Sequence, residues 1–179
     1  KKNKVGYFIL TSGTTGKAKI IQHSPKNLNT FKKVSLDSAC WLCTYSPGTY
    51  AWFQTIMLIM HVPNQKIVFS KLNNAKKILY CMKNHGVTSV PATPSFWRYL
   101  MMVIPEKELK QISIKQITLG GERIDQTILD SLKSLFPDAQ ITHIFAATET
   151  GPAIIVSDGI AGFPSKYLKM PLLHNQVEI

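Results

Sequence analysis

The sequence predicts an α/β fold: helices flank a mainly parallel sheet, and an N-terminal β-hairpin carries a loop suited to binding phosphate. Short apolar runs alternate with segments of helical period, a pattern typical of β-α-β units. A hydroxyl-rich and glycine-rich segment, residues 11–19, lies between two apolar runs. Two later apolar runs end in short polar motifs. Because ligands of such sheets collect at the carboxyl ends of parallel strands, we expect the two motifs to share one crevice.

The expected elements follow one another along the chain. Strands are predicted over residues 5–10, 20–21, 41–45, 66–70, 87–90, 115–119 and 140–146. Helices are predicted over residues 25–34, 49–60, 73–85, 94–103 and 125–136. Ser24 and Pro25 are typical of a helix start, and Gly86 is typical of a helix end. A chain of 179 residues is expected to form one domain with a sizeable core.

The segment from Thr11 to Lys19 contains four hydroxyl side chains, two glycines and two lysines. Backbone N–H groups of a glycine-rich turn can converge on an anion, and hydroxyls and lysine ammonium groups add donors and charge. The spacing differs from that of a Walker P-loop, because only two residues separate Gly13 from Gly16 and Lys17 is followed by Ala18. A plain Ser/Thr/Gly turn is the alternative interpretation.

The two later motifs follow apolar runs in the second half of the chain. The first run, residues 117–119, ends in Gly120-Gly121-Glu122. The second begins at Ile141 and ends in Phe145-Ala146-Ala147-Thr148-Glu149. Their positions predict that both motifs lie at the carboxyl ends of strands.

Taken together, the three segments resemble those of the adenylate-forming enzymes: acyl-CoA synthetases, adenylation domains of peptide synthetases, and luciferases. The loop pattern of that family is roughly [ST]-S-G-[ST]-[ST]-G-x-P-K, which residues 11–19 fit except at Ala18. A G-G-E or G-G-A turn and a later Y-G-x-T-E motif follow in the same order and at similar spacing. Here Phe145 stands for the tyrosine and Ala146 for the glycine, and the resemblance covers about residues 5–163.

The resemblance implies that residues 1–179 are a partial AMP-binding (adenylation) domain. The family's ribose-binding aspartate and its C-terminal domain with a catalytic lysine have no counterpart in this sequence. The implied reaction is ATP-dependent: a carboxylate attacks the α-phosphate, giving acyl-AMP and pyrophosphate, and the acyl group then passes to a thiol of coenzyme A or a carrier protein. The chain alone is expected not to turn over.

The resemblance also implies roles for individual residues. The loop residues expected to hold the β- and γ-phosphates of ATP are Thr11, Ser12, Gly13, Thr14, Thr15 and Gly16, with Lys19 assisting. The residues expected around the adenine of ATP or AMP are Gly121, Glu122, Phe145 and Ala146, with Phe145 stacking on the base. Thr148 is expected to contact the α-phosphate and Glu149 to bind Mg²⁺, a cation that prefers oxygen ligands.

Other readings of single residues stay open. Phe145 could be an ordinary core residue, and Glu122 could cap the next helix. His23 and His143 are expected to be ordinary polar residues rather than catalysts.

One segment bears on the substrate. Peptide-synthetase domains resemble one another in an F-D-x-S context whose aspartate pairs with the α-ammonium of an amino acid. The corresponding stretch, residues 45–52, contains no acidic residue. A buried ammonium without a counter-ion is costly. The sequence therefore favours a fatty or other acyl or aryl carboxylate over an amino acid, and it leaves coenzyme A and a carrier protein open as acceptors.

Composition limits the other function classes. The formal net charge is +11, but only Arg98 and Arg123 among twenty-one basic residues are arginine, the side chain preferred for base readout. No nucleic-acid partner is therefore expected. No membrane span is expected either, because no apolar run is long enough to cross a bilayer. Three cysteines, including a lone C-x-x-C at Cys40 and Cys43, predict free thiols and a cytoplasmic location rather than a metal site. The main rival to an enzyme fragment is a non-catalytic adenylation-like nucleotide-binding scaffold.

Overall fold

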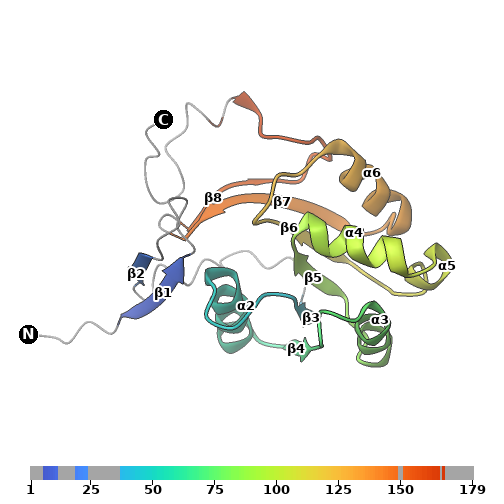
Figure 1. Cartoon of the computed structure of the whole chain (residues 1–179), viewed down its shortest axis with the longest axis horizontal. Coiled ribbons are helices and arrows are strands. Elements are labelled where there is room, and N and C mark those ends of the chain that lie inside the picture. Colours follow the sequence, from blue (N-terminus) through green and yellow to red (C-terminus); the bar gives the residue numbers. More distant parts are fainter. Residues whose placement is uncertain (1–5, 12–18, 24–36, 149–150, 166, 168–179) are drawn as a thin grey trace, which may run out of the picture.

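The computed structural model describes residues 6–11, 19–23, 37–148, 151–165 and 167. Within these ranges it confirms the predicted fold, a mostly parallel sheet flanked by helices, together with an N-terminal hairpin (Figure 1). The helix expected over residues 25–34, the loop at 12–18 and Glu149 lie outside the described residues.

A six-stranded sheet has the order β4-β3-β5-β6-β7-β8, and a separate two-stranded sheet pairs β1 with β2. Neighbouring strands of the large sheet are parallel except for β8, which runs antiparallel to β7. The strands are β1 (Tyr7–Thr11), β2 (Lys19–His23), β3 (Ala39–Cys43), β4 (Gln65–Phe69), β5 (Ser89–Ala92), β6 (Gln116–Leu119), β7 (Gln140–Ala147) and β8 (Gly151–Val156). The strand β8 was not predicted.

The helices begin close to their predicted starts because polar side chains cap them. Caps come from the side chains of Thr49, Asn74, Thr93 and Asp125, each of which accepts a hydrogen bond from a backbone N–H of the first turn. The helices are α2 (Tyr50–His61), α3 (Ala75–Asn84), α4 (Pro94–Val103), α5 (Glu106–Leu109) and α6 (Gln126–Leu135). The short helix α5 was not predicted.

The strand β5 begins two residues later than predicted. The Val87 N–H donates a hydrogen bond to the Met82 carbonyl oxygen, so Val87 belongs to the turn that ends α3 and not to β5. β5 also contains Pro91, which cannot donate to a sheet ladder. Its pairing with β3 is accordingly limited to Trp41 and Ser89, and the Thr44 hydroxyl donates to the Pro91 carbonyl beyond that point.

Side chains of β3 alternate between two layers. Cys40 and Leu42 join the main core, which α3, α4 and α6 build on one face of the sheet. Ala39 and Trp41 pack with Leu58 of α2 on the opposite face. A strand turns its side chains with a period of two, so Cys40 and Cys43 point to opposite faces. The C-x-x-C therefore cannot chelate one metal ion, and all three cysteines are buried free thiols.

The N-terminal hairpin packs on the outer side of α2. Ile9 of β1 is buried with Tyr50 and Met57 of α2, and the ring centroid of His23 lies 5.2 Å from that of Tyr50. The predicted hairpin is therefore present, and α2 connects it to the large sheet (Figure 1).

The order of the parallel strands reverses between β3 and β5. In an open α/β sheet such a switch point leaves a crevice outside the carboxyl ends of the strands. Tyr45 and Thr93 follow the two strands at this point. The topology therefore predicts a ligand-binding crevice at the edge of the sheet where the two sequence motifs also lie.

Candidate functional site

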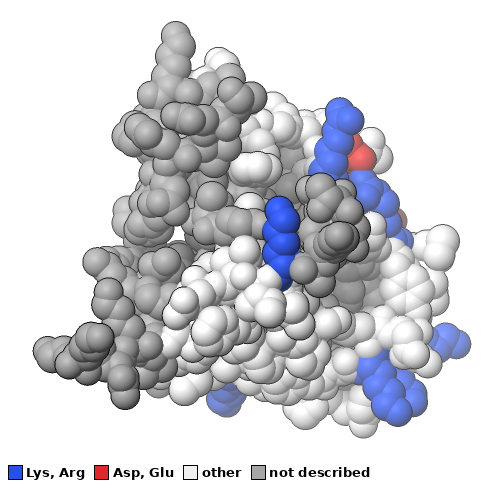
Figure 2. All heavy atoms as spheres, turned by 60° about the vertical axis from the view of Figure 1, so that its left-hand side comes forward, with Lys and Arg blue, Asp and Glu red and all other residues white. Residues whose placement is uncertain are grey.

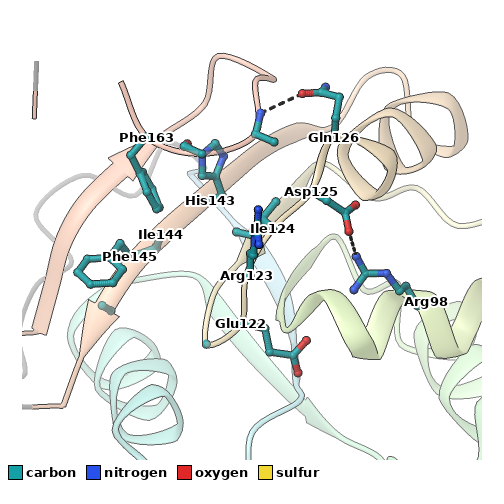
Figure 3. A pocket seen from close by; sticks show the side chains of 14 residues that line it. Arg98, Glu122, Arg123, Ile124, Asp125, Gln126, His143, Ile144, Phe145 and Phe163 are labelled. Carbon is teal, nitrogen blue, oxygen red and sulfur yellow. Dashed lines mark hydrogen bonds and ion pairs between the residues drawn. The ribbon is translucent and has the colours of Figure 1, made fainter. Parts of the chain in front are cut away.

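A cleft of about 1140 Å³ lies at the carboxyl ends of β6 and β7. Four segments line it: Arg98 of α4, residues 121–126 after β6, residues 143–146 of β7, and residues 161–163 beyond β8 (Figure 3). The cleft thus brings together the four residues for which the family resemblance implies a place around adenine, namely Gly121, Glu122, Phe145 and Ala146.

The Gly120-Gly121-Glu122 corner turns the chain away from β6. Gly121 has φ +81°, a conformation that disfavours residues with a Cβ. The turn brings the Glu122 carboxylate to the start of α4, where its Oε2 accepts hydrogen bonds from the Ser95 N–H (3.0 Å) and the Ser95 hydroxyl (2.6 Å). Glu122 does act at a helix terminus, but at that of α4 rather than the helix that follows it. Asp125 caps that following helix, α6.

The surroundings of Glu122 act on its pKa in opposite directions. Partial burial raises the pKa, whereas the hydrogen bonds from Ser95, a further one from Thr93 and the charge of Arg98 lower it. The net effect is a pKa below the ordinary value of 4.5. Glu122 is therefore a carboxylate at neutral pH, placed at the positive end of α4.

The lowered pKa predicts how acid affects the fold. A carboxylate with a lowered folded-state pKa stabilises the protein fully above its unfolded pKa, and this contribution is lost as the pH falls through the folded-state value. We expect Glu122→Gln to make the free energy of unfolding less dependent on pH below about 4.5. Urea titrations of both proteins from pH 6 to pH 3 measure the difference, and parallel pH profiles would contradict the prediction.

Charged side chains form one wall of the cleft. Arg98 Nη2 lies 2.6 Å from Asp125 Oδ2, and the pair ties α4 to the start of α6 (Figure 3). Arg123 is exposed on the same wall. Both arginines of the chain therefore line the cleft. Sequence reasoning missed Arg98, because it lies far from either motif along the chain.

Aromatic side chains form the opposite wall. Phe145 is 47% exposed and Phe163 is 38% exposed, and their ring centroids lie 6.0 Å apart at an interplanar angle of 67°. Phe145 is therefore not an ordinary core residue. His143 is almost fully buried below them, and its Nε2 lies 2.7 Å from the Gly162 carbonyl oxygen, as expected for a structural polar residue. Sequence reasoning missed Phe163, since no motif marks it.

The remaining predicted site residues lie elsewhere. Thr11 and Lys19 are paired directly across the hairpin, and residues 12–18 connect them along the chain. Lys19 is exposed, whereas the Thr11 hydroxyl is buried without a hydrogen-bond partner among the described residues. Thr148 forms a turn after β7 and does not line the cleft. Ser12, Gly13, Thr14, Thr15, Gly16 and Glu149 fall outside the described residues.

The surface gives no sign of a continuous basic patch on the face shown in Figure 2. There the described lysine and arginine side chains stand in separate groups, one of them beside an acidic side chain. Across the described ranges, none of the helices has the length and apolar character needed to cross a membrane. No cluster of three metal-ligating side chains occurs in those ranges either.

Comparison with known sequences decides the family. A profile of the family described as "AMP-binding enzyme" matches residues 1–179. The chain belongs to this family. The predicted resemblance to adenylate-forming enzymes is thereby confirmed.

Individual relatives are distant and longer than this AMP-binding chain. It is 26% identical to a dimodular nonribosomal peptide synthase of Bacillus subtilis strain 168 over 97% of its own length and 7% of that protein. An ATP-bound RpMatB-BxBclM chimera has a similar fold, with a TM-score of 0.71 at 18% identity over 87% of this chain and 32% of the other. A Brucella canis acyl-CoA synthetase gives a TM-score of 0.70 at 18% identity over 92% and 31%.

Proposed function

We propose that the chain is the nucleotide-binding part of a ligase that activates a carboxylic acid as acyl-AMP. The observation that carries the proposal is the convergence of two distant motifs on one cleft: Gly121 and Glu122 on one wall, Phe145 and Ala146 on the other. Membership of the AMP-binding family and the fold shared with an ATP-bound protein support it.

The cleft suits an adenine ring. Its volume of about 1140 Å³ exceeds what a base needs, and an exposed face of Phe145 is available for stacking. Gly121 and Glu122 line the same cleft as Phe145, and their backbone polar groups would bind the edge of the base. In this arrangement Phe145 and Gly121 bind and orient the base, and Glu122 keeps the turn in place through Ser95.

The phosphates of ATP would bind at the hairpin and at the turn after β7. The Thr11–Lys19 loop would surround the β- and γ-phosphates with N–H groups, hydroxyls and the Lys19 ammonium. Thr148 would donate to the α-phosphate. The buried Thr11 hydroxyl, with no partner among the described residues, fits a donor at the base of an anion site. Bound Mg²⁺, held by Glu149, would offset the charge that develops as pyrophosphate leaves.

The reaction then follows from this placement. A carboxylate oxygen of the acid forms a bond to the α-phosphorus while the bond to the pyrophosphate oxygen breaks. The products are acyl-AMP and pyrophosphate, and a thiol of coenzyme A or a carrier protein subsequently takes the acyl group and releases AMP. The residues of this chain contribute orientation and charge stabilisation, which dominate phosphoryl-type transfers.

We favour a fatty, other acyl or aryl acid as the substrate. No acidic residue occurs between Tyr45 and Trp52, at the switch point of the sheet, to pair with an amino acid's ammonium group. Burial raises the pKa of Tyr45, so its hydroxyl there is neutral. An amino-acid substrate is the alternative, favoured by the peptide synthase among the relatives. The three free thiols support a reducing, cytoplasmic location.

A non-catalytic nucleotide-binding scaffold is the second candidate. Ala18 and Ala146 replace the proline and glycine usual in the family and favour it. A scaffold, however, needs neither Thr148-Glu149 nor the four loop hydroxyls.

Acid-dependent ATP–pyrophosphate exchange separates the two candidates. The assay uses the polypeptide that carries this chain, with acetate, medium and long fatty acids, aryl acids, D-alanine and other amino acids as substrates. We expect exchange with one acyl or aryl class, and none by residues 1–179 alone. Exchange with amino acids only would show that the substrate is an amino acid and not an acyl or aryl acid. Nucleotide binding without exchange for any acid would favour the scaffold.

A further inference from the structure

We propose that Phe163 is a second base-binding residue of the cleft, and that Gln126 and His143 are positioning residues that hold it there. The inference rests on the proposed nucleotide-binding function and extends it to a loop that neither motif contains. The loop covers residues 157–163 and follows β8, the strand that the sequence did not predict.

Gln126 fixes the middle of this loop. Its Nε2 donates to the Gly159 carbonyl (2.9 Å), and its Oε1 accepts from the Ala161 N–H (2.9 Å). One side-chain amide thus holds both a donor and an acceptor of the loop backbone, across more than thirty positions of sequence. Asp158 adds a local turn, because its Oδ1 accepts from the Ile160 N–H. The loop is therefore attached to the first turn of α6, at the rim of the cleft (Figure 3).

His143 fixes the end of the loop from below. Its Nε2 bonds the Gly162 carbonyl oxygen at 2.7 Å, and its ring centroid lies 5.1 Å from that of Phe163. Gly162 has φ +87°, and the backbone bends just before Phe163. His143 belongs to β7 and lies two residues before Phe145. The same strand therefore positions Phe145 directly and Phe163 through His143.

The two phenylalanines leave apolar area exposed inside the cleft. Phe163 contacts Phe145 in a tilted, edge-type arrangement rather than covering its face, and both rings line the cleft. A base that stacks on Phe145 would therefore contact the Phe163 ring with the edge of the base or with the face of the base that points away from Phe145. Aromatic side chains bind nucleobases by stacking on their π faces. Phe163 would thus tighten binding of nucleotides but not of pyrophosphate, which has no ring.

The test is binding of AMP and of pyrophosphate to the polypeptide that carries this chain, measured by calorimetry. We expect Phe163→Leu to weaken AMP binding about tenfold, as is usual for the loss of one stacking contact, and to leave pyrophosphate binding unchanged. Phe163→Tyr keeps the ring and should bind AMP as the original protein does. Phe69→Leu is the matched control, since Phe69 is 60% exposed on β4 and does not line the cleft.

Gln126→Ala tests the positioning role. We expect it to weaken AMP binding about as much as Phe163→Leu, to raise KM for ATP in the exchange assay, and to leave kcat within about twofold. The double variant should be no weaker than Phe163→Leu alone, because both changes remove the same contact.

The outcomes are distinct. If the original protein binds neither AMP nor ATP, the proposed function fails. If it binds AMP and Phe163→Leu binds equally well, or if Phe163→Leu weakens pyrophosphate binding to the same extent, the role of Phe163 is overturned while the proposed function stands. Additive losses in the double variant would overturn the positioning role of Gln126.

Discussion

Replacing Gly151 with alanine is expected to lower the free energy of unfolding by about 3 kcal/mol, because the change combines backbone strain with a steric clash. Gly151 has φ +73°, where residues with a Cβ are strained. An alanine Cβ would lie 2.7 Å from Tyr50 Oη. Tyr50 cannot move away easily, since it is only 7% exposed and its hydroxyl accepts a hydrogen bond from Gln54.

The same substitution should also reduce exchange activity. Gly151 directly follows the segment that carries Thr148 and Glu149, so a shift at Gly151 moves the residues proposed to face the α-phosphate and Mg²⁺. Tyr50, in turn, contacts His23 at the end of the hairpin that is remote from residues 12–18. The Gly151–Tyr50 contact therefore lies between the turn after β7 and the base of the hairpin.

A double-mutant cycle with Tyr50→Phe tests this explanation. Phenylalanine removes the atom that the new Cβ would meet, so Tyr50→Phe/Gly151→Ala should recover about 1 kcal/mol relative to simple additivity in urea unfolding. The strain from φ would remain. Additive changes in the free energy of unfolding would show that the clash with Tyr50 contributes nothing.

Replacing Glu149 with glutamine is expected to lower the maximal exchange rate by about a hundredfold or more, the effect typical of removing one oriented charge from a transition-state site. Glutamine keeps the size of the side chain but loses the negative charge that a hard divalent cation prefers. The variant should also need a higher Mg²⁺ concentration for half-maximal rate.

Exchange rates over a Mg²⁺ titration measure both effects. Glu106→Gln is the matched control, because Glu106 pairs with Lys110 on the surface of α5, outside the cleft. It should change neither the rate nor the Mg²⁺ requirement. A Glu149→Gln enzyme with the original rate and Mg²⁺ dependence would exclude Glu149 as the metal ligand.

The sequence predicted those parts of the fold that depend on local signals. Caps such as Asn74 and Asp125 act within one turn of their own helix, and the alternation of apolar runs is visible at short range. The turn at Gly120-Gly121 could likewise be placed at the end of a strand, because its glycines and the run before it are adjacent in the chain.

The parts that were missed depend on contacts between distant residues. Glu122 holds Ser95 across 27 positions, and Gln126 holds Ala161 across 35. Nothing in the neighbourhood of either residue reports such a partner. The strand β8 was missed for a similar reason: it is specified by pairing with β7, and its Gly151-Pro152 start argues against a strand when read alone.

The most direct test of the central claim follows an oxygen atom. The polypeptide that carries this chain is given ATP, Mg²⁺, a thiol acceptor and its acid substrate labelled with ¹⁸O in the carboxylate, and the products are examined by mass spectrometry. Attack of the carboxylate on the α-phosphorus predicts one ¹⁸O in AMP and none in pyrophosphate. Release of ADP with labelled inorganic phosphate, or AMP without label, would contradict acyl-adenylate formation.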